Sequence, residues 1–128
     1  MEIEISGKLT AVPRGQQKYT FPACSIMRTG QSWLCYLNAA ARRVWSCDKG
    51  VNWYQNDGNV IAMPSDAVNA YQPIKKNGIL SGYTFPQILL KLDDGRHNGN
   101  VKPGVYRLYK CKSGFAFQPY KPLAVKED

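Results

Sequence analysis

Aromatic rings alternate with positive charges in the last third of the chain, and no acidic residue interrupts residues 101–126. Aromatic faces stack on unpaired bases, and lysine and arginine side chains neutralise phosphates. This combination predicts sequence-tolerant binding of single-stranded nucleic acid. An ordinary strand that buries its rings and solvates its lysines has the same pattern, so that alternative stays open. The segment contains Tyr106, Tyr109, Phe115, Phe117 and Tyr120 among Lys102, Arg107, Lys110, Lys112, Lys121 and Lys126.

Other aromatic and basic residues could extend such a surface. The pairs Arg42-Arg43 and Lys75-Lys76 suit phosphate contacts, although paired cations are commonly just solvated. Trp53-Tyr54 precedes an expected hairpin tip, where adjacent residues point in opposite directions and one ring is expected to be exposed. A tryptophan beside amides also suits stacking on a sugar, which keeps carbohydrate binding as an alternative. The expected nucleic-acid contacts are Tyr19, Arg42, Arg43, Trp53, Lys75, Lys76, Tyr106, Arg107, Tyr109, Lys110, Lys112 and Phe115.

Catalytic chemistry has little support in this sequence. Its single histidine, His97, lies in the polar segment 93–100, which is typical of a solvated loop. Asp93 and Asp94 precede it without the spacing of a calcium loop, and no phosphate-binding glycine-rich loop is present. A small nuclease that pairs His97 with Glu2 or Glu4 is the weakest alternative, because no spacing supports it. We therefore expect no catalytic residue, no metal and no cofactor.

Length and charge narrow the class of protein. A chain of 128 residues fits one domain, residues 1–128. Its net charge of +8 favours a polyanionic partner such as DNA or RNA. The early acidic residues at the N-terminus are unlike a signal peptide, and no apolar stretch is long enough to span a bilayer. We therefore expect a cytoplasmic protein of a bacterium or of an infected host cell, and one that does not bind membranes. The four cysteines form no Cys-x-x-Cys pair, which favours separate buried thiols.

Most of the elements expected to position these residues are strands. Two-residue alternation and turn residues predict a first hairpin from residues 3–9 and 18–21, and a second around Asp57-Gly58. Residues 38–43 are expected to form either a short helix or a turn before residues 44–47, and a short helix is expected near residues 65–71. Trp33 and Trp45 are expected in the core. Many short strands favour a mainly β small barrel over a sandwich. The other expected strands cover residues 25–27, 32–37, 44–47, 82–85, 87–92, 105–112 and 115–125.

Two segments carry a resemblance to a known family. Residues 102–108 (KPGVYRL), the following Gly-Phe turn and the closing Pro122-Leu123-Ala124-Val125 resemble the last strands of filamentous-phage gene V-type single-stranded DNA-binding proteins. The opening MEIEISG and Lys18-Tyr19-Thr20-Phe21 are also similar, whereas residues 28–77 have no counterpart. The resemblance implies an OB-like antiparallel barrel, a homodimer, cooperative coating of single-stranded DNA during bacteriophage replication and no catalysis. It also implies that Tyr19 contacts DNA.

A second function class stays open on the same evidence. A compact basic β-domain without a catalytic set also suits a phage-encoded inhibitor that binds a host defence or replication protein. A pull-down from host lysate would separate this interaction protein from a nucleic-acid-binding protein. An exposed edge strand would make pairing of two copies feasible in either case.

Overall fold

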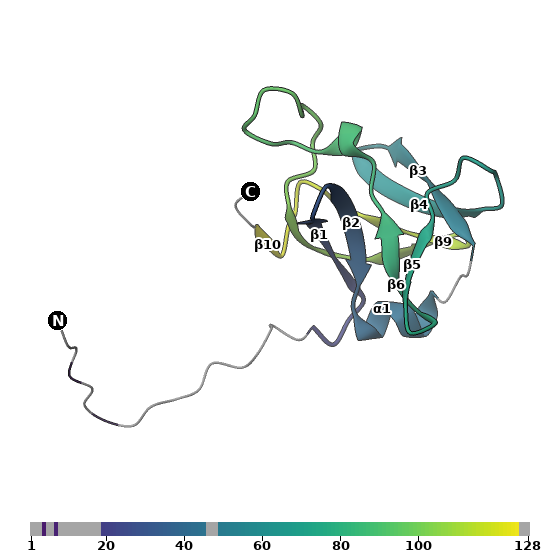
Figure 1. Ribbon diagram of the computed structural model, residues 1–128, viewed down its shortest axis with the longest axis horizontal. Coiled ribbons are helices and arrows are strands. Elements are labelled where there is room, and N and C mark those ends of the chain that lie inside the picture. The colour runs from purple at the N-terminus through teal and green to yellow at the C-terminus, as the bar shows by residue number, and fades with distance from the viewer. Residues whose placement is uncertain (1–3, 5–6, 8–18, 46–48, 126–128) are drawn as a thin grey trace.

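The computed structural model describes residues 4, 7, 19–45 and 49–125, in which nearly all regular structure is strand (Figure 1). One α-helix, α1 (Ala39–Val44), and one 3-10 turn, η1 (Gln87–Leu89), complete this part of the chain. The strands are β1 (Ala23–Thr29), β2 (Ser32–Leu37), β3 (Gly50–Asn56), β4 (Asn59–Ser65), β5 (Pro73–Lys76), β6 (Ile79–Thr84), β7 (Gly104–Arg107), β8 (Tyr109–Cys111), β9 (Gly114–Phe117) and β10 (Ala124–Val125).

The strands form two antiparallel sheets. The larger sheet has the order β10-β7-β1-β2-β6-β5, and the smaller has the order β3-β4-β9-β8. The prediction of a mainly β fold is confirmed. The closed OB-like barrel is not found, because the strand pairing within residues 19–45 and 49–125 leaves two separate sheets with edges of their own.

The strand expected over residues 105–112 divides between the two sheets, which explains part of this difference. β7 pairs with β1 in the larger sheet, whereas β8 pairs with β9 in the smaller one. Between them, the N–H of the buried Leu108 donates to the carbonyl of Pro22 at 2.9 Å. This bond continues the register of β7 with the chain before β1 by one position, and the next residue, Tyr109, already pairs in the smaller sheet. The chain thus crosses from one sheet to the other at Leu108 instead of curving as a continuous strand.

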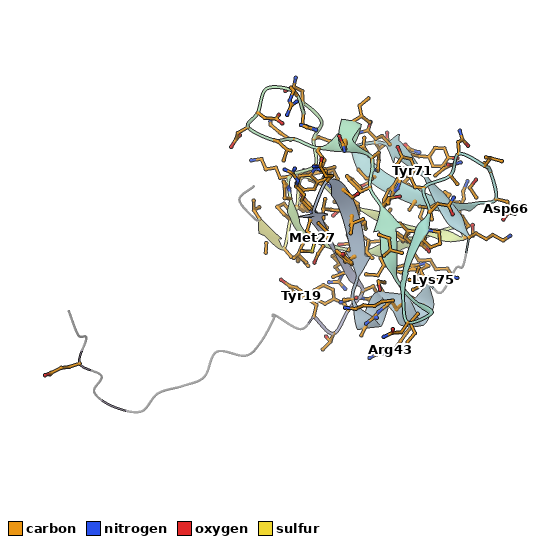
Figure 2. The ribbon with its side chains drawn as sticks, viewed as in Figure 1. Tyr19, Met27, Arg43, Asp66, Tyr71 and Lys75 are labelled. Carbon is orange, nitrogen blue, oxygen red and sulfur yellow. The ribbon has the colours of Figure 1, made fainter. Side chains whose placement is uncertain are left out.

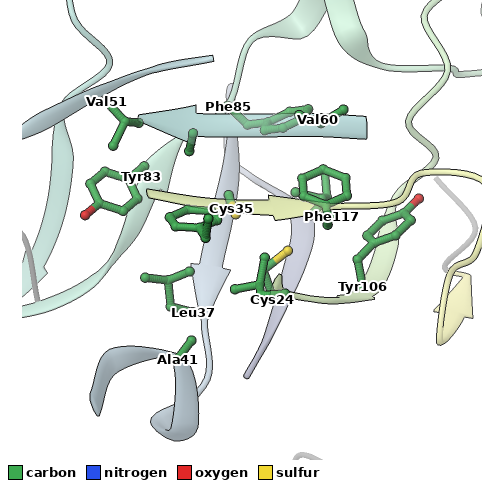
Figure 3. Packing of buried hydrophobic residues seen from close by; sticks show 14 of the residues in the cluster. Cys24, Cys35, Leu37, Ala41, Val51, Val60, Tyr83, Phe85, Tyr106 and Phe117 are labelled. Atoms are coloured by element: carbon green, nitrogen blue, oxygen red, sulfur yellow. The ribbon is translucent and has the colours of Figure 1, made fainter. Parts of the chain in front are cut away.

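An aromatic core fills the space between the two sheets (Figure 3). Tyr106 of β7 lies 4.8 Å from Phe117 of β9 between ring centroids, and Tyr83 of β6 lies 6.1 Å from Phe115. Close backbone approach also matters, since a Cβ at Gly82 would collide with the Cys35 carbonyl oxygen of the neighbouring strand. Burial of rings from both sheets supplies the main stabilisation of this fold.

Two-residue turns close four of the described hairpins, and two of these turns have positive φ at both central positions. Asp57 and Gly58 have φ of 51° and 82° and join β3 to β4, as the Asp-Gly step predicts. Asn77 and Gly78 have φ of 55° and 78° and join β5 to β6. Both turns have positive φ at both central positions, which Asn, Asp and Gly tolerate best.

Of the helix and the turn expected at residues 38–43, the structure has the helix, α1, and its cap also fastens the chain before β1. The Asn38 side-chain oxygen accepts the Ala41 N–H at 2.9 Å as N-cap and the Ala23 N–H at 3.0 Å. The Asn38 side-chain amide donates to the Phe21 carbonyl at 2.9 Å. One side chain thus holds α1 and the segment entering β1 together.

Several other local expectations are wrong or fall outside the described residues. Residues 67–70 form a turn rather than a helix, residues 87–89 form η1 rather than a strand, and residues 19–22 are not a strand. Glu4 and Gly7 of the expected first hairpin are not in a strand, and its remaining residues and Cys47 lie outside the described residues. Trp33 is buried as expected, and Trp45 packs against the core while half-buried. Cys24, Cys35 and Cys111 are free thiols.

Candidate nucleic-acid interface

An arginine and three rings gather where the chain crosses between the sheets. The Arg107 guanidinium carbon lies 4.3 Å from the Phe21 ring centroid and 5.8 Å from that of Tyr109. The Tyr19 and Phe21 centroids are 5.3 Å apart. We call Tyr19, Phe21, Arg107 and Tyr109 the Arg107 cluster. It joins residues more than eighty positions apart in the sequence into one cationic aromatic surface.

The backbone around the Arg107 cluster is held on both sides. Asn38 fixes the Phe21 carbonyl, and Ala23, the first residue of β1, pairs with Arg107 in the ladder of β1 and β7. Buried Leu108 separates exposed Arg107 from exposed Tyr109. Because alternate residues of an extended chain point in opposite directions, burial of Leu108 turns both neighbours outward. Arg107 and Tyr109 therefore share one side of the chain across the crossing.

Two more predicted cations continue from this cluster along β8. Lys110 and Lys112 are both exposed, the first within the strand and the second in the turn to β9 with φ of 53°. β8 is an edge strand of the smaller sheet, and no strand within residues 19–45 and 49–125 pairs with its outer side. Lys110 is opposite the buried Phe115, so it projects from the other face of β8 than Tyr109, at this open edge. Lys110 and Lys112 therefore place positive charge along the edge next to Tyr109.

The aromatic residues Tyr106 and Phe115 must be removed from the predicted interface. Tyr106 is 0% and Phe115 2% exposed, so neither face of either ring is open to a base. Both rings point into the space between the sheets, because removing apolar ring surface from water lowers the free energy of the folded protein. Burial also raises the pKa of Tyr106 to about 12, and its hydroxyl donates to the Lys102 carbonyl at 2.6 Å.

The two aromatic neighbours on β3 exchange the roles that the sequence analysis gave them. Trp53 faces inward, where its indole N–H donates to the Thr84 carbonyl at 3.1 Å and its ring lies 4.9 Å from Phe85 between centroids. Tyr54 faces outward and is 50% exposed. The rule that only one of two adjacent rings is exposed is confirmed, and the exposed ring is Tyr54 rather than the expected contact Trp53, because Trp53 finds a part-buried acceptor and aromatic neighbours.

The paired cations lie on other elements. Arg42 and Arg43 are exposed in the last turn of α1, and Lys75 and Lys76 are exposed on the edge strand β5. Figure 2 shows Tyr19, Arg43 and Lys75 along the lower end of the molecule in that view. These cations widen the positive field, whereas the ring and guanidinium contacts that define the Arg107 cluster join β7, β8 and the segment before β1.

The described acidic side chains lie on other segments than this cluster. Asp57 is in the turn between β3 and β4, Asp66 follows β4 and pairs with Lys49 at 3.1 Å, and Asp93 and Asp94 lie in the loop after β6 and η1. Glu4 completes this set. β7, β8 and β9 contain no acidic residue. The Arg107 cluster, together with Lys110 and Lys112, therefore forms a positively charged strip.

His97 belongs to a self-contained loop. The Asp94 carboxylate accepts the backbone N–H groups of Arg96 and His97 at 2.9 Å and 3.1 Å and lies 2.7 Å from His97 Nδ1. The backbone N–H of Arg96, followed by the contacts of His97, lowers the pKa of Asp94 to about 2. His97 also lines a surface hollow with Gln87, Ile88, Arg96, Asn98 and Gly99. Asp94 thus stabilises the loop conformation.

No protein-family model, no curated protein and no solved structure matches this chain. Its resemblance to the phage DNA-binding family therefore stays a prediction from the quoted residues. Within the described residues, no helix is long and apolar enough to cross a membrane.

Phe21 and Tyr54 are the surface residues that the sequence analysis missed. The alternation of side chains along a strand predicts that Tyr54 is exposed if Trp53 is in the core. Phe21 had no such signal, because its place beside Arg107 depends on the pairing of β1 with β7 and on the Asn38 hydrogen bond.

Proposed function

We propose that this protein binds single-stranded nucleic acid, with little dependence on sequence, through the Arg107 cluster and the lysines of β8. The observation that supports this most is the stacking of Arg107 on Phe21 beside exposed Tyr109, in a segment free of acids. Stacked guanidinium and phenol groups offer faces to bases, and Lys110 and Lys112 offer charge to phosphates. The proposed setting is the cytoplasm of a bacterium or an infected cell, and the proposed process is phage DNA replication.

Preorganisation favours this function for the Arg107 cluster. Arg107 is already held against an aromatic face, so less side-chain entropy is lost when a base or phosphate arrives. A sequence-tolerant ligand also fits, because every base has a π-face and every nucleotide has a phosphate. Pairing of two copies through an edge strand such as β8 or β5 remains part of the proposal, and sedimentation of the protein with and without oligonucleotide would test it.

Titration with a single-stranded oligothymidylate and with a duplex of equal length, at several salt concentrations, tests the function. The proposal expects tighter binding of the single strand, because only unpaired bases can stack on Tyr109. It also expects affinity to fall steeply with added salt, because phosphate binding releases counterions. Equal affinity for both ligands, or no binding of either at low salt, would reject the proposal. Capture of a specific host protein in place of nucleic acid would favour the inhibitor.

A further inference from the structure

The smaller sheet carries a row of side chains that runs straight from Tyr109 to Tyr54. Tyr109 of β8 is opposite Ala116 of β9, Ala116 is opposite Ile61 of β4, and Ile61 is opposite Tyr54 of β3. The row therefore takes one residue from each of the four strands. Its first member, Tyr109, also belongs to the Arg107 cluster, so the two surfaces are continuous.

The row lies on the face of the sheet that points away from the core. Val60 and Ala62, on either side of Ile61, are 0% exposed, and Phe115 and Phe117, on either side of Ala116, are also buried. Because side chains alternate along a strand, Ile61 and Ala116 face outward. Tyr54 is 50% and Tyr109 46% exposed, while Ile61 and Ala116 are half-buried between them. The result is a shallow apolar strip with a tyrosine at each end.

We propose that a bound single strand runs across this outer face, from the Arg107 cluster over Ala116 and Ile61 to Tyr54. This inference rests on the proposed function and adds the path and length of the bound segment. β3, β4, β8 and β9 contain no acidic residue, and the exposed cations Arg107 and Lys112 lie at the Tyr109 end, with Lys110 at the same sheet edge on the opposite face. Charge and exposed rings together fit a polyanion with stacking bases better than they fit a neutral apolar partner.

The dimensions of the sheet set the expected length of the bound segment. Three strand spacings of about 4.8 Å place the two ends of the row roughly 14 Å apart. A stacked strand advances about 3.4 Å per nucleotide, so the row accommodates about four nucleotides. A dinucleotide bound at the Arg107 cluster is too short to reach Tyr54. The contribution of Tyr54 must therefore depend on oligonucleotide length.

A length series of oligothymidylates and oligouridylates tests this path with Tyr54→Ala and wild-type protein. We expect equal affinities for dinucleotides, and for octanucleotides a loss of about 5- to 150-fold in the variant, the range that one stacked base contributes. Tyr36→Ala is the matched control, since Tyr36 is a half-buried tyrosine on β2 of the larger sheet. Tyr36→Ala should bind every length as wild type does. A loss in Tyr54→Ala with either ribose or deoxyribose supports the path.

Two substitutions of opposite charge at Ile61 separate an effect on binding from an effect on folding. Ile61→Glu should weaken octanucleotide binding and Ile61→Lys should retain or strengthen it, although both place a long polar side chain at the same half-buried position. One outcome would refute the path and leave the function standing. In it, wild type binds octanucleotides and Tyr109→Ala weakens that binding, but Tyr54→Ala and Ile61→Glu bind octanucleotides as tightly as wild type does. If wild type binds no single strand, the function itself fails.

Discussion

Arg107 lies with its guanidinium carbon 4.3 Å from the centroid of the Phe21 ring. Contacts of this kind contribute about 0.5–2 kcal/mol, depending on how far they are withdrawn from water. Arg107 is exposed, so its distal edge remains open to solvent while its plane is fixed. The arrangement presents one positive charge in a fixed orientation, as the proposed binding of a polyanion requires.

Replacement of Tyr109 by alanine should weaken single-strand binding without unfolding the protein. Tyr109 is 46% exposed, and loss of one stacking ring should lower affinity about 5- to 150-fold. Thermal melting should change little, because exposed substitutions commonly cost under about 0.5 kcal/mol. Fluorescence anisotropy with an octathymidylate measures the effect, and Tyr36→Ala is the control. Unchanged affinity in Tyr109→Ala would remove this ring from the interface.

Replacement of Lys110 or Lys112 by glutamine should change the salt dependence of binding. Each phosphate contact on a single strand contributes about 0.7 to the slope of log affinity against log salt concentration, so each variant should flatten the slope by about that amount. Lys91→Gln is a suitable control, because Lys91 is an exposed lysine in the loop after η1. A slope that stays the same in the β8 variants, or falls equally in the control, would contradict a local phosphate contact.

The same two-residue alternation both succeeds and fails in this chain, for physical reasons. It places Arg107 and Tyr109 on one side because Leu108 between them is buried. It cannot say which side of a strand meets the second sheet, so Tyr106 and Phe115 were assigned to the surface although both lie in the core. Trp53 was misassigned because its partner, the Thr84 carbonyl, is distant in sequence.

Turn chemistry was informative where both central residues were considered. The Asp57-Gly58 step correctly located the hairpin of β3 and β4. Asn77-Gly78 carries the same signal, and it indicates the hairpin of β5 and β6 that the basic neighbours Lys75 and Lys76 obscured. Turn residues cannot predict which strands belong to which sheet, because this depends on the crossing at Leu108 and on pairings between strands distant in the sequence.

Asn38 links stability to the candidate interface. Asn38→Ala removes the helix N-cap and leaves the Ala23 N–H without its acceptor, which should cost about 1–3 kcal/mol in the free energy of unfolding. Asn38→Asp retains an oxygen acceptor for both N–H groups but loses the amide that donates to the Phe21 carbonyl. We therefore expect Asn38→Asp to fold but to bind single strands less tightly than wild type. Urea denaturation and anisotropy measure the two effects.

An Asn38→Asp variant with wild-type affinity would show that the hydrogen bond to the Phe21 carbonyl is not needed to form the Arg107 cluster. Ser81→Ala, at a half-buried strand position on β6, serves as the control for a minor polar change elsewhere. Its stability and affinity should remain near those of wild type.

Tyr106 should make stability depend on alkaline pH. Its pKa is raised to about 12 by burial, against about 10 in the unfolded chain, so the folded state holds this proton more tightly. The corresponding stabilisation is complete below pH 10 and is lost as pH rises from about 10 to about 12. Tyr106→Phe removes the hydrogen bond to the Lys102 carbonyl, at a cost of about 1 kcal/mol near pH 8.

Urea denaturation of wild type and Tyr106→Phe at pH 8 and pH 11 isolates this contribution from other titrating groups. The stability advantage of wild type should shrink or reverse at pH 11. A constant difference between the two proteins at both pH values would show that the Tyr106 hydroxyl does not titrate as its burial requires.

Amide chemical-shift mapping during titration with an octathymidylate tests the central claim most directly. The account predicts that the largest shifts fall on residues 19–21, 107–112, 116, 61 and 54, and that they diminish as salt is added. Shifts confined to the loop around His97, or the absence of any shift at low salt, would contradict binding of a single strand at the Arg107 cluster.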